Sequence, residues 1–315
     1  MLTYNYRDIA FSPYSERRKL FISELVGSKR VQSFSRALEE QVEQLIQSFS
    51  CLPPSTMEPV NLNEKIFALI DGFIGTRRKA PQIQVALVVL SAFSAQDFFP
   101  ASPVSRWVDR FIGLEARYRA IFVTLLWAMS EIIKNPRVMI KVQAEIRSSV
   151  SGKPRVQVSD TPQLKYLRMV IKETLRLHPP APFLIPRETT QHVQLLGYDL
   201  PPKTRIFVNV WAIGRDPACW KNPEEFYPER FEDADIDFQG TDFELLPFGA
   251  GRRICPAIPM GLMNVEFTLA SLLHSFDWKL PEGMAPEDVS MEGTGRQIVC
   301  RSTPLYLIPS PYASG

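Results

Sequence analysis

The stretch that decides the fold lies near the C-terminus and reads Pro247-Phe248-Gly249-Ala250-Gly251-Arg252-Arg253-Ile254-Cys255-Pro256. A single cysteine follows a loop that is rich in glycine and carries two adjacent arginines. Glycine lets the backbone approach a flat ligand closely, because it has no side chain. Arginine forms paired hydrogen bonds with carboxylates. The loop therefore predicts a site for a flat ligand with an acidic edge.

Cys255 is the candidate metal ligand of this loop. One thiolate can be the complete set of protein ligands for haem iron, and thiolate ligation favours O–O bond cleavage. A lone cysteine is more commonly only a small buried residue. Here Arg252, Arg253 and the first N–H groups of a helix expected after the loop would lower the pKa of the thiol. An inert buried cysteine needs neither the arginines nor the helix N–H groups. The context therefore favours Cys255 as a metal ligand.

Composition excludes several other classes of protein. The chain has 315 residues, of which 45% are apolar and 22% charged, and its net charge is +2. This predicts a buried core, and the absence of a basic run gives no sign of nucleic-acid binding. Four scattered cysteines and three scattered histidines favour neither zinc nor disulfides, and they indicate a cytosol-facing compartment. The N-terminus shows no secretory signal. The apolar runs at 83–93 and 120–129 fall short of the roughly 20 residues that span a bilayer, so we expect at most peripheral membrane contact.

Hydrophobic spacing predicts a mainly helical chain with strands in its second half. The expected helices are 33–49, 122–133, 138–146, a helix that Asp160 or Thr161 opens and that ends at Leu177, and 258–276. The expected strands are 192–196 and 205–211, joined by a turn at 197–203, and a short strand at 305–308. Between the strand at 205–211 and the helix at 258–276, residues 216–251 are predicted to form a meander packed by its own side chains.

Glu173 and Arg176 lie three residues apart on the predicted helix, so they share one face. Taken alone, they would be an ordinary exposed ion pair. A further arginine, Arg230, lies among aromatic residues ahead of the cysteine loop. It could join the pair in one buried network, in which every polar group would need a partner.

Three motifs in this order resemble the cytochrome P450 family of haem-thiolate monooxygenases, and the details are similar to plant microsomal members. They are Glu173-x-x-Arg176, Pro228-Glu229-Arg230-Phe231 and Phe248-x-x-Gly251-x-Arg253-x-Cys255. The resemblance covers residues 121–310. It implies a mainly α fold with a small β-sheet region, a P450-like fold that is incomplete in its distal helices. It also implies one haem-thiolate domain over 1–315, with 1–150 a shortened helical part and 151–315 the haem-binding core.

The resemblance implies roles for the cofactor loop. Cys255 would be the axial ligand to the iron of haem b, and Phe248 would pack beside its sulfur and tune the iron. Gly251 would allow the close approach of the loop to the cofactor. Arg253 and Arg187 would pair with the haem propionates.

The resemblance also implies roles outside the loop. Glu173, Arg176 and Arg230 would form the structural triad that holds the meander. Residues 181–185 and 294–297 would line the substrate pocket.

The sequence departs from the family pattern at several points. Ala257 stands where the family usually has glycine. The tryptophan of an N-terminal Trp-x-x-x-Arg helix is missing, although Arg17 or Arg18 could take the role of its arginine. Ile121 follows Ala120 directly, so the roof helices and the Gly-x-Asp/Glu-Thr turn that relays protons to oxygen are missing, and Thr124 lies too late to replace it.

These departures predict an internally deleted chain without the family's usual membrane anchor, and they leave no catalytic residue identified. The first functional hypothesis is a monooxygenase at the endoplasmic reticulum membrane. It would insert one atom of O2 into a small apolar organic substrate, with electrons from an NADPH-dependent flavoprotein reductase. The alternatives are an electron-independent haem-thiolate isomerase or dehydratase, and a haem-binding but catalytically inactive product.

Overall fold

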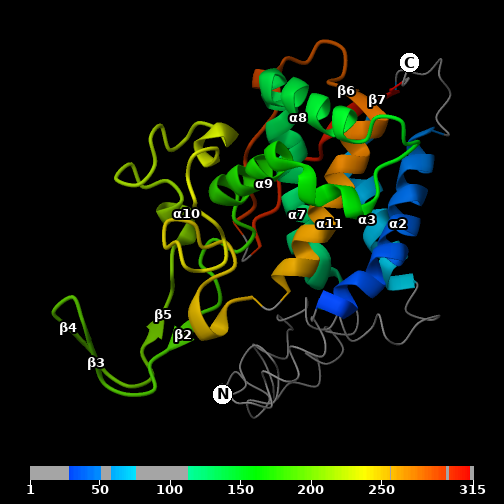
Figure 1. Cartoon of the computed structure of the whole chain (residues 1–315). Helices are drawn as coiled ribbons and strands as arrows, with labels where there is room; N and C mark the ends of the chain where they lie inside the picture. The colour runs from blue at the N-terminus through cyan, green and yellow to red at the C-terminus, as the bar shows by residue number, and fades with distance from the viewer. Residues whose placement is uncertain (1–27, 51–57, 76–112, 256, 296–297, 313–315) are drawn as a thin grey trace.

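The computed structural model describes residues 28–50, 58–75, 113–255, 257–295 and 298–312. Their core is a group of packed helices, shown on the right of Figure 1. These helices are α2 (Ser28–Ser50), α3 (Leu62–Gly75), α7 (Gly113–Lys134), α8 (Pro136–Ser149), α9 (Lys165–Leu177) and α11 (Ile258–Ser275). Helix α11 packs against α2, α7, α8 and α9, so the C-terminal helix is central to the core.

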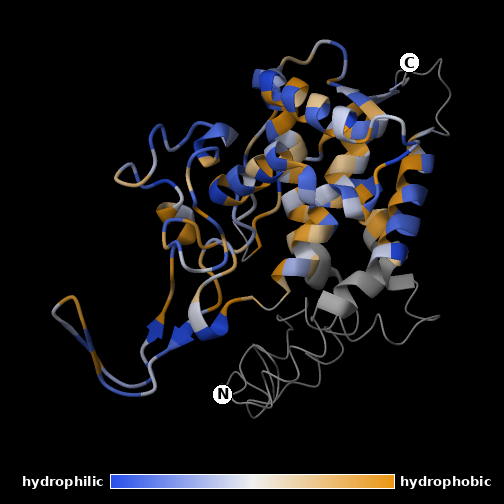
Figure 2. Cartoon of the chain, in the orientation of Figure 1, coloured by the Kyte–Doolittle hydropathy of each residue, from blue (hydrophilic) through white to orange (hydrophobic). Residues whose placement is uncertain are grey.

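Hydropathy explains why these helices pack together. In α7, residues 122–133 are all buried, which is the fate expected of a helix that is apolar on most sides. Helix α9 is amphipathic instead, with buried residues that include Leu167, Val170 and Ile171. Figure 2 shows the apolar residues of the group concentrated where its helices face one another. Helix packing of this kind supplies most of the hydrophobic stabilisation of an α-helical domain.

The break between α7 and α8 lies where the sequence predicts it. Asn135 ends α7 by donating its backbone N–H to the carbonyl of Glu131 at 3.0 Å, and Pro136 occupies the first turn of α8. Proline suits that position because the first N–H groups of a helix have no partner within it. The predicted helices at 33–49, 122–133 and 138–146 lie within longer observed helices, and the predicted helix at 258–276 extends one residue beyond α11, since Phe276 begins β6 (Phe276–Lys279).

The predicted start of α9 is wrong. Residues Val158–Gln163 form a short 3-10 helix that contains Pro162, and α9 begins only at Lys165. The Asp160 carboxylate accepts hydrogen bonds from the Gln157 N–H and the Lys153 ammonium, so it caps the 3-10 helix and not α9. The helix ends at Leu177 as predicted, and the N–H of His178 donates to the carbonyl of Thr174.

The strands form small antiparallel pairs. The sheet beside the helices has the order β1 (Val60–Asn61), β7 (Tyr306–Pro311), β6 (Phe276–Lys279). The predicted strand pair at 192–196 and 205–211 is wrong in its partners: β3 (Val193–Leu195) pairs with β4 (Tyr198–Leu200), which lies in the predicted turn. Strand β5 (Arg205–Ile206) pairs with β2 (Arg187–Glu188), and Val210–Ile213 is a helical turn, α10.

The β3–β4 hairpin and residues 216–251 lie to one side of the helices, on the left of Figure 1. The latter region consists of turns and one short 3-10 helix, Pro228–Phe231, and it has the irregular course predicted for a meander. The apolar run at 83–93, Arg17 and Arg18 lie outside the described residues. Across the described part of the chain, the observed structure is mainly helical with small sheets, as the sequence predicts.

Candidate cofactor site

Backbone hydrogen bonds close the loop that precedes Cys255. The N–H of Cys255 donates to the carbonyl of Phe248 at 3.0 Å, and the N–H of Ile254 donates to that of Gly251 at 3.1 Å. Gly249 and Gly251 have φ angles of 74° and 66°, in the left-handed region that favours glycine. A Cβ atom at Gly251 would meet nothing within 4 Å, so the backbone conformation and not a packing contact requires glycine there.

Cys255 is half-buried directly before α11. Burial raises the pKa of its thiol, and the N–H of Ala257 at the N-cap of α11 opposes this by a hydrogen bond to the sulfur. Neither Arg252 nor Arg253 is among the causes of the shift, so the prediction that these arginines lower the thiol pKa is wrong for the chain by itself. A bound metal ion deprotonates a coordinating thiol directly, so ligation does not need them.

Two arginines from distant parts of the sequence meet at this loop. Arg187 lies in β2, and its Nη2 atom is 3.5 Å from the backbone carbonyl oxygen of Arg253. Burial and the positive charge of Arg253 both lower the pKa of Arg187. Like charges in a half-buried position destabilise each other, and a nearby anion relieves that repulsion. The pair therefore fits the carboxylates of haem.

Phe248 and Ala257 flank the cysteine without strain. The Phe248 ring packs edge-on against Phe238, with ring centroids 5.6 Å apart, and its carbonyl holds the Cys255 N–H. Ala257 stands where the family usually has glycine, but its φ of −94° is one that any residue adopts. The extra methyl group is buried at the start of α11, so this departure leaves the loop geometry intact.

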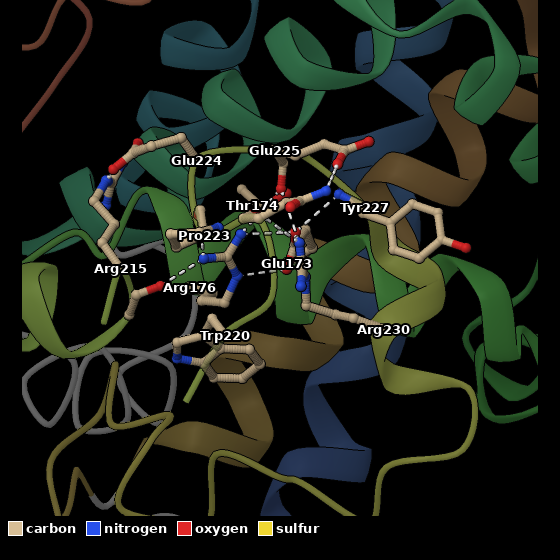
Figure 3. A network of polar contacts seen from close by, with 12 residues as sticks. Glu173, Thr174, Arg176, Arg215, Trp220, Pro223, Glu224, Glu225, Tyr227 and Arg230 are labelled. Carbon is tan, nitrogen blue, oxygen red and sulfur yellow. Dashed lines mark hydrogen bonds and ion pairs between the residues drawn. The ribbon is translucent and has the colours of Figure 1, made fainter. Parts of the chain in front are cut away.

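Glu173, Arg176 and Arg230 lie in one network, which Figure 3 shows. Both carboxylate oxygens of Glu173 accept from Arg176, at 2.7 and 2.8 Å, and Oε1 also accepts from Arg230 Nε at 2.9 Å. The side chains of Glu173 and Arg176 have no exposed surface. The N–H of Tyr227 supplies a further hydrogen bond to Glu173 at 2.9 Å. The network thus joins α9 to the meander.

Backbone carbonyls occupy the remaining donors of the two arginines. Arg176 donates to the carbonyls of Gly214, Pro223 and Glu225. Arg230 donates to those of Lys221, Asn222 and Glu225. These carbonyls belong to irregular segments that have few backbone partners of their own, so the buried guanidinium groups replace secondary structure there.

Sequence analysis missed a second network beside the first. The carboxylate of Glu229 accepts hydrogen bonds from Arg137, Lys141 and the hydroxyl of Tyr166. Burial favours its neutral form, but these hydrogen bonds outweigh burial and lower the pKa of Glu229 to about 2. Arg137 and Lys141 lie four residues apart on α8, a spacing that could have indicated a common acidic partner.

Helix α7 carries Thr124, the residue that the sequence places too late to replace the missing Gly-x-Asp/Glu-Thr turn. Thr124 is buried in α7, and its hydroxyl donates to the carbonyl of Ala120 at 2.8 Å. It is therefore engaged within its own helix, as threonine commonly is. Of the segments predicted to line the pocket, 181–185 is described and carries the exposed Phe183, whereas residues 296 and 297 of the other lie outside the described residues.

Other kinds of site find no support in the described residues. Within those ranges, no three His, Cys, Asp or Glu side chains are grouped so as to hold a metal ion. The helices in the same ranges include none with the length and apolar content needed to cross a bilayer.

A fold and a loop of this kind define a haem-thiolate protein, and comparison with known proteins identifies the family. The cytochrome P450 family model matches residues 120–309, so the chain belongs to the cytochrome P450 family. The chain is 39% identical to 4-hydroxyphenylacetaldehyde oxime monooxygenase of Sorghum bicolor, over 99% of this chain and 74% of the relative. It is 41% identical to cytochrome P450 71B34 of Arabidopsis thaliana, over 99% of this chain and 78% of the relative.

The structure search agrees on the fold. A zebra fish cytochrome P450 solved with abiraterone superposes with a TM-score of 0.73, covering 99% of this chain and 85% of that one at 22% identity. The predicted P450-like fold is therefore confirmed. Haem b is the cofactor of this family, and the single cysteine, the glycine-rich backbone and the two arginines of the loop fit it.

The alignments also confirm that the chain is internally shortened. The match to the sorghum enzyme runs over 397 residues, whereas the whole chain has only 315. The relative thus carries residues within the aligned span that have no counterpart here. The family model begins to match at residue 120, next to the predicted junction between Ala120 and Ile121.

Proposed function

We propose that this chain is a monooxygenase of the haem-thiolate type, which inserts one atom of O2 into a small apolar organic substrate. Its relatives support the oxidoreductase class, since one carries the name of an oxime monooxygenase. When bound, haem supplies the reduction and cleavage of oxygen. The particular substrate of that relative is not carried over to this chain.

One observation carries the proposal: the half-buried Cys255 lies at the end of a loop whose backbone is closed by its own N–H. A fixed loop holds the sulfur in one position and so presents it to a metal without a cost of ordering. In the proposed site, Cys255 ligates the iron and Phe248 shields the sulfur from water. Gly251 lets the loop lie close to the ring, and Arg253 and Arg187 neutralise the propionates.

The triad of Glu173, Arg176 and Arg230 has a supporting role in this proposal. It holds the meander that leads into the cysteine loop. We further propose that residues 1–315 act as one haem-thiolate domain, with the haem-binding core in 151–315 and a shortened helical part in 1–150. Contacts of α2 with α11, of α7 with α9 and α11, and of α3 with α2 and α7 support a common core.

The electrons would come from a reductase, as in the family generally, and we propose an NADPH-dependent flavoprotein. We propose a cytosol-facing location at the endoplasmic reticulum membrane, by analogy with the microsomal type that the sequence resembles. The mixed charge of the chain, +2 overall, supports no role in nucleic-acid binding.

Spectroscopy and turnover test the proposal in sequence. The purified chain is reconstituted with haem, reduced and exposed to carbon monoxide. We expect the Soret band of a thiolate-ligated haem, followed by substrate oxidation when reductase and NADPH are added. Soluble, folded protein that binds no haem would refute the proposal.

A second candidate function is favoured by a specific observation. The Thr124 hydroxyl donates to the carbonyl of Ala120, and the family's oxygen-activating turn has no counterpart in the sequence. Loss of a positioned acid–base group commonly lowers a rate by about 10²–10⁴. The chain would then bind haem without inserting oxygen, or it would act as an isomerase or dehydratase that needs no external electrons.

Two assays separate these functions. A lipid hydroperoxide supplied without reductase would be converted only by the electron-independent enzyme. A thiolate-type spectrum with turnover in neither assay would identify a haem-binding protein without catalysis. Oxidation that depends on NADPH supports the first proposal alone.

A further inference from the structure

A buried polar cluster outside the cofactor loop joins three segments of the chain. We call Trp127, Glu131, His178 and Arg301 the α7 clamp. Trp127 and Glu131 lie on α7, His178 follows the last residue of α9, and Arg301 lies near the C-terminus. Neither the predicted motifs nor the proposed chemistry uses these side chains.

The His178 imidazole holds the first two members together. It stacks on the Trp127 ring, with centroids 4.2 Å apart and ring planes 4° from parallel. Its Nε2 atom lies 2.6 Å from Glu131 Oε1. This hydrogen bond ties the imidazole to Glu131 in addition to its stack on Trp127. Both side chains are nearly buried, with exposures of 12% and 8%, so water competes little for the contact.

The clamp reaches the C-terminal segment through two further contacts. Trp127 Nε1 donates to the carbonyl of Val299 at 3.0 Å, and Arg301 Nη1 donates to the hydroxyl of Ser130 at 2.8 Å. Burial lowers the pKa of Arg301, and the negative charge of Glu131 opposes this. Glu131 therefore interacts with His178 by a hydrogen bond and with Arg301 through its charge.

The same contacts connect residues that adjoin the two segments, 181–185 and 294–297, that the resemblance assigns to the substrate pocket. The N–H of Val299 donates to the carbonyl of Pro180 at 3.1 Å, which ties the C-terminal segment to the loop after α9. A Cβ atom at Gly293 would lie 2.4 Å from the Val299 side chain, so this region is tightly packed. A displacement of His178 or Trp127 would thus move both segments together.

We propose that His178 is a positioning residue, which through its stack on Trp127 fixes the 179–186 loop against the 298–302 segment and so shapes the apolar substrate pocket. This inference rests on the proposed function for the identity of the pocket. The first part of the experiment described below measures only the packing. The inference and the proposed function can therefore fail separately. His178 lies three residues before Ala181, where the predicted pocket segment begins, and it acts through the backbone that follows it.

The first arm is hydrogen exchange on the full chain with and without haem. The His178→Gln variant keeps a donor for Glu131 but loses the ring stack, and Trp127→Phe keeps a ring but loses the donor to Val299. We expect both to lose protection at the Val299 amide and to keep it in α11. The control is His192→Gln, since His192 is exposed on the loop that leads into β3.

The second arm compares two azoles that bind haem iron in the reconstituted protein. A bulky triarylmethyl imidazole reaches the pocket walls, whereas imidazole itself senses the iron. We expect each clamp variant to bind the bulky azole about tenfold more weakly and to bind imidazole within about twofold of the parent chain. A fold defect would weaken both azoles equally.

Two results would overturn the inference. In one, the Val299 amide keeps its protection in both clamp variants. In the other, protection falls throughout α7 and α11 together, which would make His178 a general folding residue. A parent chain that fails to bind haem refutes the proposed function, while the exchange arm still decides whether His178 positions these segments.

Discussion

Arginines gather around Glu173 and around Cys255, and the two regions differ in how the charge is balanced. Around Glu173, one carboxylate and several backbone carbonyls take up the donors of Arg176 and Arg230. Around Cys255, Arg187 has a lowered pKa because it is buried beside Arg253. In the first region the donors of both arginines are taken up within the chain, whereas the second region is suited to an anionic ligand. The comparison thus contrasts an arrangement whose donors are used within the chain with one that we propose binds a ligand.

Replacement of the cysteine should give the largest effect and leave the other region intact. In Cys255→Ser, the thiolate-type absorbance should disappear, because serine is a poor ligand for haem iron. The free energy of unfolding of the haem-free chain should change by less than about 1 kcal/mol. Absorption spectra and urea unfolding measure the two quantities. The control is Cys219→Ser, an exposed cysteine, and an unchanged pigment in Cys255→Ser would refute iron ligation.

The Glu173→Gln substitution should instead act mainly on the free energy of unfolding. It leaves Arg176 and Arg230 buried without a negative partner, which costs about 3–5 kcal/mol of unfolding free energy. Tryptophan fluorescence during urea unfolding measures it, since Trp220 lies 5.2 Å from the Arg176 guanidinium. Glu40→Gln, in an exposed pair with Arg36, should change stability by less than about 0.5 kcal/mol. Equal effects of the two glutamine variants would show that the buried network is not special.

Arg187→Gln tests whether the second region is built for an anion. Haem should leave this variant about 10–100 times more readily, in line with the loss of other groups that support a metal site. The haem-free chain should be at least as stable as the parent, because the repulsion from Arg253 is removed. Transfer of haem to an acceptor protein gives the first quantity. Arg205→Gln, on the paired strand β5 and exposed, is the matched control.

The smallest effect on unfolding free energy concerns Glu229, whose network lies beside that of Glu173. Its pKa is lowered from 4.5 to about 2 in the folded chain, so its contribution is present above pH 4.5 and is lost as the pH falls towards 2. Because its partners Arg137 and Lys141 are half exposed, we expect about 1 kcal/mol. In Glu229→Gln, unfolding free energy should depend less on pH over that window. A parallel pH profile would contradict this assignment.

The sequence predicted the elements that depend on neighbours along the chain. The helices follow from apolar spacing, and the break at Asn135 and Pro136 follows from local backbone chemistry. Glu173 and Arg176 share a helical face whatever the rest of the fold does. Errors arose where pairing is not local: the strand at 193–195 took its partner from the predicted turn, and Asp160 bonded to Lys153 instead of opening α9.

In the cofactor loop too, the sequence predicted what depends on neighbouring residues and failed for what depends on the packing of the domain. Its glycines, its arginines and Cys255 lie within a few residues of one another, so the sequence alone indicated a binding loop and, by resemblance, a haem-thiolate protein. The thiol pKa was predicted in the wrong direction, because burial depends on the packing of the whole domain and not on adjacent charges.

The amino-acid sequence by itself indicated the family, the candidate ligand cysteine and the helical character of the chain, since each depends on residue type and short spacing. Only the tertiary structure placed Arg187 beside Arg253, Glu229 beside Arg137, and His178 between Trp127 and Glu131. Each of these contacts joins residues 47 or more positions apart. Such contacts are decided by how helices and loops pack, and no local pattern encodes that packing.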